Sequence, residues 1–295
     1  MVFFLSACQS LPPVQTASNQ QHLDVPFFAQ EKYQCGPAAL ASMLHFAGTP
    51  SSADDLVDEV WLPGRHGSLA IELIAAARAR GLLAYPINTF AGLIAELDEG
   101  HPVLIQQNLL FGWLPQWHFA VVIGYANAGD TLILHSGTKE NFSVNRKWFE
   151  ERWSKADNVG YVMLPPPTLP ANSDALKLAG AIDDVSVSSK SPALSFWAAA
   201  AEYHEKEPVI LFGYANAQYQ SGALAQAVHL YRKVSQLDPT FHPAWNNLAS
   251  VLNEMGCPTL AGDAIEQALQ QAPENETYID TRDEIFAGED GPHCQ

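Results

Sequence analysis

The second half of the chain carries one pattern twice, with an offset of 34 residues from Gly222 to Gly256. Small residues recur where paired helices would touch, a glycine recurs where a turn would join them, and a proline ends each copy. We therefore predict two stacked helix pairs, over residues 208–239 and 242–273. The matched positions are Ala215 with Ala249, Gly222 with Gly256, Ala227 with Ala261 and Pro239 with Pro273.

This period and these positions resemble the tetratricopeptide repeat family. The resemblance implies an all-α module, placed over residues 192–290, that binds a protein partner. Stacked helix pairs need about three units to bury their apolar faces, so we expect capping helices over residues 194–204 and 277–286. A linker over residues 166–191 should precede the module, because it begins within the run of three prolines at residues 165–167. A helical segment over residues 174–181 remains open inside this linker.

Length and charge narrow the possible functions. A chain of 295 residues with 47% hydrophobic and 16% charged residues has enough apolar material for about two folded modules. Lys and Arg total 15 against 32 Asp and Glu, a formal charge of -17, so the molecule repels phosphate backbones. Nucleic acid is therefore not expected as a partner.

The N-terminal residues indicate a lipid anchor. Residues 2–7 form a short apolar run that ends in small residues directly before Cys8, and this resembles the lipobox of bacterial lipoproteins. The expectation is a signal remnant and flexible tether over residues 1–22, with the body attached to the membrane by lipid alone on the periplasmic side of the bacterial envelope. A frayed apolar N-terminus is the alternative. In an oxidising compartment, Cys257 and Cys294 could pair.

Residues 23–165 show helical periods first and extended runs afterwards. Helices are predicted over residues 37–48, 69–80 and 90–99, with Ser68 as the cap of the second. Short strands are predicted from their β-branched and aromatic content. Helices followed by strands indicate an α+β domain with a largely antiparallel sheet. The predicted strands cover residues 102–106, 119–125, 131–134 and 160–164.

Cys35 is the candidate nucleophile. It stands directly before Gly36 and Pro37, which begin a predicted helix, and the positive end of a helix dipole should lower the pKa of its thiol. Gln30 lies five residues upstream, where its amide could stabilise an oxyanion together with the Cys35 backbone N–H. The alternative is a buried structural cysteine.

His118 is the candidate base, because it opens an apolar strand and could project from its mouth into a cleft. A structural histidine is the alternative. His135 is the second choice for the base. The other histidines lie in predicted helices, in loops or in the second module.

The blocks around Cys35 and His118, together with Gln30, resemble the bacterial double-glycine leader peptidases over residues 24–164. The resemblance implies a papain-like fold, a Cys-His dyad, a glutamine oxyanion donor and peptide-bond hydrolysis without a metal or other cofactor. These enzymes place an Asp where this chain has Ser136. A serine can bind the imidazole but supplies no charge. Asn141, Asn127 and Asp130 are alternatives for that third position.

Three functions follow from these residues. The first is a cysteine peptidase that hydrolyses peptides or proteins, with repeats that recruit a substrate or partner. The second is a weak or inactive peptidase-like adaptor that binds peptides and scaffolds an envelope complex. The third keeps the acyl-enzyme but resolves it with an amine, as a transferase does.

Overall fold

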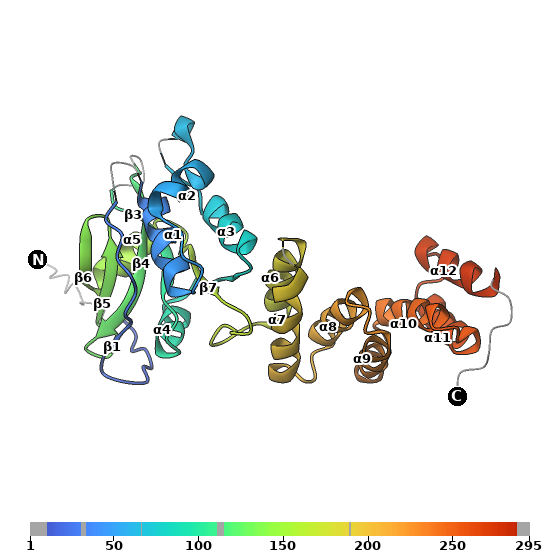
Figure 1. The fold of residues 1–295 in the computed structure, drawn as a ribbon. Coiled ribbons are helices and arrows are strands. Elements are labelled where there is room, and N and C mark those ends of the chain that lie inside the picture. The colour runs from blue at the N-terminus through green and yellow to red at the C-terminus, as the bar shows by residue number, and fades with distance from the viewer. Residues whose placement is uncertain (1–10, 31–33, 66, 111–114, 189, 288–295) are drawn as a thin grey trace, which may run out of the picture. The chain divides into compact units, whose positions relative to one another are not determined.

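The computed structural model describes residues 11–30, 34–65, 67–110, 115–188 and 190–287. Cys8, Cys294 and His66 lie outside these ranges. The chain divides into two compact units (Figure 1). The first contains the described residues up to Pro165 together with residues 170–172, and the second contains residues 166–169 and those from Ser173 onward.

An antiparallel sheet forms the centre of the first unit. Its order is β2-β7-β3-β4-β5-β6, and β1 pairs with part of β4. All the strand pairs in the described residues are antiparallel, which confirms the predicted α+β class. The strands are β1 (Gln21–His22), β2 (Leu83–Pro86), β3 (Val103–Asn108), β4 (Trp117–Ala126), β5 (Thr131–Ser136), β6 (Lys139–Asn145) and β7 (Gly160–Leu164).

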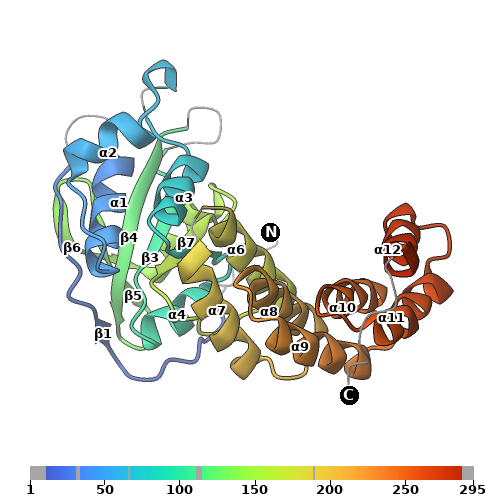
Figure 2. The same ribbon diagram turned by 45° about the vertical axis from the view of Figure 1, so that its right-hand side comes forward.

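Helices cover both faces of this sheet. On one face, α1 packs its buried residues Leu40 and Leu44 against Phe119 and Val121 of β4, beside which it lies in Figures 1 and 2. On the other face, α4 and α5 contact β3 and join through the rings of Phe90 and Phe149. The helices are α1 (Cys35–Phe46), α2 (Ala53–Val60), α3 (Ala70–Ala79), α4 (Phe90–Asp98) and α5 (Arg146–Ser154), with a short 3-10 turn at Pro63–Arg65.

Several elements of this unit were not predicted. These are α2, α5, β1, β2 and β6. The start of α2 did carry a local signal, because Ser52 accepts a hydrogen bond from the Asp55 backbone N–H. The predicted cap of α3 was wrong: Leu69 occupies the N-cap position, and the buried Ser68 hydroxyl has no hydrogen-bond partner in the described residues.

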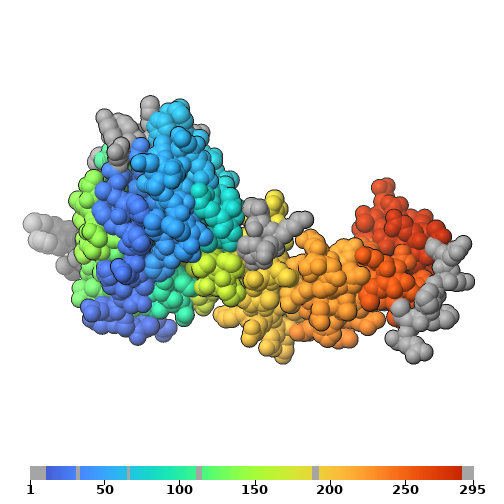
Figure 3. Space-filling view, viewed as in Figure 1, coloured from blue at the N-terminus to red at the C-terminus, as the bar shows by residue number. Residues whose placement is uncertain are grey.

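Residues 11–20 do not form the free tether that their composition predicted. Arg146 donates a hydrogen bond to the Pro12 carbonyl at 2.7 Å, and the Ala17 N–H donates to Asp98 at 2.9 Å. β1 then continues the segment along β4, and the space-filling view shows this dark blue stretch on the surface of the first unit (Figure 3). The segment has few apolar side chains to bury, but hydrogen bonds to its backbone atoms hold it against the first unit.

The second unit is a series of antiparallel helices that pack on their neighbours. Its core is rich in alanine, as the repeat predicted, with Ala215, Ala227, Ala249 and Ala261 all fully buried. The repeat pairs and both capping helices are confirmed, but most of the predicted linker is helix α6. The helices are α6 (Ala175–Ser188), α7 (Lys190–Tyr203), α8 (Pro208–Gln220), α9 (Leu224–Leu237), α10 (His242–Glu254), α11 (Pro258–Gln271) and α12 (Glu276–Ala287).

The described helices include none long and apolar enough to cross a membrane. Cys257 is disulfide-bonded, while its expected partner Cys294 lies outside the described residues. That pairing therefore stays a prediction.

Candidate active site

Cys35 is the first residue of α1 and is half-buried at the point where the helix meets β4. Gly36 allows a close approach here, because a Cβ at this position would overlap the Ser68 side chain. The backbone N–H groups of Phe119 and Gly36 make hydrogen bonds to the sulfur. The thiol therefore lies among backbone donors, as expected at a helix N-terminus.

Burial, however, raises the pKa of the Cys35 thiol, and the hydrogen bonds from Phe119 and Gly36 offset this only in part. The expectation of a lowered pKa was wrong for this reason. It considered the helix end alone, whereas the thiol also lies beneath a strand that removes it from water.

His118 is the second residue of β4, and only 7% of its surface is exposed. Its Nε2 shares a hydrogen bond of 2.9 Å with the Ser136 hydroxyl at the end of β5. This contact leaves Nδ1 for another partner. Burial lowers the pKa of His118 to about 4, so the imidazole is neutral at neutral pH and able to accept a proton.

Cys35 and His118 line one open cleft with a volume of about 640 Å³. Within the described residues no hydrogen bond joins the sulfur to the imidazole, and Ser136 is the side-chain partner of the ring. Catalytic hydrogen bonds often form only once substrate is bound. The resting arrangement is a neutral thiol and a neutral imidazole in the same cleft.

Gln30 also lines this cleft. Its backbone N–H donates to the Gly137 carbonyl at 3.2 Å, which ties the loop before α1 to the turn after β5. Its side-chain oxygen is buried without a hydrogen-bond partner in the described residues. The amide also borders a small cavity of about 10 Å³ behind Cys35, which is room for about one water molecule.

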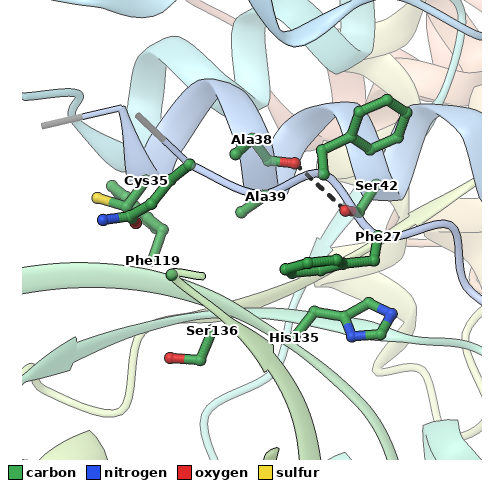
Figure 4. A pocket seen from close by; sticks show the side chains of 11 residues that line it. Phe27, Cys35, Ala38, Ala39, Ser42, Phe119, His135 and Ser136 are labelled. Atoms are coloured by element: carbon green, nitrogen blue, oxygen red, sulfur yellow. Dashed lines mark hydrogen bonds between the residues drawn. The ribbon is translucent and has the colours of Figure 1, made fainter. Parts of the chain in front are cut away.

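His135, the second choice for the base, has both ring nitrogens occupied. Its Nε2 donates to the Val25 carbonyl at 2.8 Å, and its Nδ1 accepts from the Asn141 N–H at 3.4 Å. Figure 4 shows the His135 ring beside Phe27 and away from Cys35, while Ser136 lies between His135 and Cys35 in this view. The structure therefore assigns His135 a packing role.

The alternatives for the third position point elsewhere. The Asn141 side chain binds His22, and that of Asn127 binds Thr131 in the turn at the far end of β4. Asp130 belongs to the same turn. Ser136 alone among these residues contacts the imidazole.

Trp117 and Asp157 are among the cleft residues that the sequence did not predict. Trp117 precedes His118, and Asp157 follows α5; both line the cleft. Nothing local marks them, because only the packing of α5 beside β3 places residue 157 near residue 118.

Comparison with known proteins concerns each unit separately. Residues 22–161 match the family model described as the Peptidase_C39 like family. No curated protein matches the chain.

Among solved structures, a C39-like peptidase from Bacillus anthracis is 19% identical over 50% of this chain and 98% of its own, with a TM-score of 0.42. A double glycine motif protease from an AMS/PCAT transporter, in complex with the leader peptide, is 21% identical over 52% of this chain and 98% of its own, with a TM-score of 0.40. The first tetratricopeptide repeat domain of Spaghetti, bound to an HSP90 peptide, is 16% identical over 38% of this chain and 90% of its own, with a TM-score of 0.37.

Proposed function

We propose, on the premise that residues 22–161 form a Peptidase_C39-like domain, that the chain is a cysteine peptidase of the bacterial cell envelope. The observation that supports this most is the shared cleft, in which a thiol, a neutral imidazole and a glutamine amide meet. Cys35 is the nucleophile, His118 the base, and Gln30 the oxyanion donor. Ser136 orients the imidazole through its hydrogen bond to Nε2.

The reaction follows from the two protonation states. As the Cys35 sulfur attacks a peptide carbonyl carbon, its proton passes to His118 Nδ1, and the oxyanion is stabilised by Gln30 and backbone N–H groups. The C–N bond then breaks, and the imidazolium returns its proton to the leaving amine. Water, deprotonated by the imidazole, hydrolyses the thioester and regenerates the thiol.

A thiol-directed peptidyl probe tests this assignment. We expect the wild-type protein to be labelled at Cys35, the Cys35→Ala variant to lose that label, and His118→Gln to be labelled much more slowly. Circular dichroism should show that both variants remain folded. Equal labelling of wild type and His118→Gln over the pH range would contradict a role for the imidazole.

A second candidate is a peptide-binding adaptor with little or no activity. The uncharged states of Cys35 and His118 favour this candidate, because a neutral thiol is a weak nucleophile. Burial keeps the thiol and the imidazole uncharged, and Ser136 provides no counter-charge. Its signature is a peptide that binds the cleft, protects Cys35 from alkylation and is recovered intact by mass spectrometry. Cleaved peptide with wild type, and intact peptide with Cys35→Ala, would exclude it.

We also propose that the helical module recruits a protein substrate or partner, as stacked helix pairs offer an extended binding surface. Spaghetti binds an HSP90 peptide through such a domain. Deletion of the second unit should leave cleavage of short peptides intact and abolish capture of the partner. The deletion can be made at residue 173, where the second unit resumes.

The anchor remains a proposal on the residues before Cys8. A lipidated Cys8 would hold the body at the periplasmic side of a membrane. Intact-mass analysis of the N-terminal fragment from a membrane fraction tests this, because a diacylglyceryl thioether adds a defined mass that Cys8→Ala would lose.

A further inference from the structure

The cleft that holds Cys35 and His118 has an uneven charge. Among the described residues that line it, Asp157 is the one Asp, Glu, Lys or Arg. Asp157 is exposed, and in the described part of the chain its carboxylate makes no ion pair. The nearby cations are engaged elsewhere, since Lys155 pairs with Glu151 and Arg152 stacks on Trp148.

The backbone holds Asp157 in a defined place. Asp157 and Asn158 both adopt left-handed conformations, with φ of 53° and 51°, a region that Asp and Asn enter more readily than most residues. The C-terminal end of the turn is held in place, because the Trp153 indole N–H and the Gln106 N–H both donate to the Val159 carbonyl, at 2.9 Å and 3.0 Å. The carboxylate is therefore presented from a braced turn.

Trp117 supplies a second recognition feature. It immediately precedes His118 in β4 and lines the same cleft, yet 51% of its surface is exposed. An exposed indole next to a binding cleft offers an apolar surface and a ring face that attracts cations. The long apolar stem of Lys or Arg can lie on such a ring while its charged end reaches a carboxylate.

We infer that this cleft selects polypeptide segments that carry Lys or Arg close to the scissile bond. Asp157 binds the cation, and Trp117 contacts its stem. The inference rests on the proposed peptidase function and adds a substrate class to it. The formal charge of -17 acts in the same direction, because it draws basic segments toward the molecule over longer distances.

The first experiment digests a defined pool of 14-residue peptides with randomised sequence and maps the cleaved bonds by mass spectrometry. We expect Lys and Arg to be enriched about fivefold to tenfold over Gln within three residues of the bond, from one exposed ion pair and one cation–π contact. Asp157→Asn, which keeps the size and the left-handed preference, should reduce the enrichment to about twofold or less. Raising the salt to 0.5 M should act in the same direction.

Asp130→Asn is the matched control. It removes the same charge from an exposed turn at the other end of β4, so it should leave the enrichment unchanged. Cleavage without a basic preference, or an equal preference in wild type and Asp157→Asn, would overturn the inference.

A binding arm separates this inference from the proposed function. Fluorescence anisotropy would compare two dye-labelled decapeptides of Gly and Ser, with a central Lys in one and Gln in the other, on the Cys35→Ala variant. A fivefold preference for Lys that Asp157→Asn removes supports the inference even if wild type cleaves nothing, in which case only the peptidase assignment fails. Equal binding of both probes would count against the basic subsite itself.

Discussion

Replacing Ser136 with Asp should convert the neutral thiol and imidazole into a more reactive pair. Burial lowers the pKa of His118 from its ordinary 6.5 to about 4, and a difference of that size corresponds to about 3 kcal/mol against the imidazolium. The Ser136 hydroxyl lies 2.9 Å from Nε2. A carboxylate placed there would stabilise the charged ring where the serine does not.

The distance between a carboxylate at position 136 and the His118 ring sets how much the carboxylate stabilises the imidazolium. Opposite charges about 4 Å apart attract by about 4 kcal/mol at an effective dielectric of 20, which is close to the loss from burial. The two effects should nearly cancel, so the pKa of His118 in Ser136→Asp should return toward its ordinary value. An imidazole that holds a proton more tightly also favours the Cys35 thiolate.

Alkylation measures this directly. Iodoacetamide reacts with the thiolate, and mass spectrometry of the peptide that contains Cys35 separates its labelling from that of other thiols. We expect Ser136→Asp to react at least about tenfold faster than wild type at pH 6, because each unit of pKa corresponds to a factor of ten. NMR titration of the His118 ring should show the matching rise of its pKa.

Ser136→Asn is the control, since it has nearly the shape of Asp without its charge. It should leave the alkylation rate within about twofold of wild type. If both variants behave like wild type, Ser136 does not act on the imidazole. If Asp and Asn accelerate alkylation equally, the charge argument is refuted.

Two further predictions concern stability. The folded pKa of His118 is depressed, so the stability linked to its neutral form is fully present above pH 6.5 and is lost as the pH falls through about 4. Urea unfolding at pH 7 and pH 3.5 should therefore show that wild type loses about 3 kcal/mol more of its free energy of unfolding than His118→Gln does. An equal loss in the two proteins would contradict a buried neutral imidazole. Gly124→Ala should destabilise the first unit by roughly 1–3 kcal/mol, since its Cβ would overlap the Gln21 backbone of β1. Gly180→Ala in α6 is the control, because nothing lies near that position and alanine favours a helix. Equal unfolding midpoints for Gly124→Ala and wild type would show that β1 does not hold residues 11–20 in place.

The sequence by itself determined the features that depend on local period and local chemistry. The 34-residue offset between Gly222 and Gly256 predicted the paired helices, because a helix pair is specified by small residues, a turn and a stop within one stretch of chain. In the same way, Gly36 and Pro37 placed Cys35 at a helix start, and an apolar run placed His118 at the mouth of a strand.

Only the tertiary structure decided how these residues behave. The Cys35 pKa is raised and that of His118 lowered because elements distant in the chain exclude water from both. The adjacent residues His135 and Ser136 have different roles because one faces Val25 and the other faces His118 across β5. Solvent exclusion and the pairing of distant strands are properties of packing, and a local pattern of residues does not specify them.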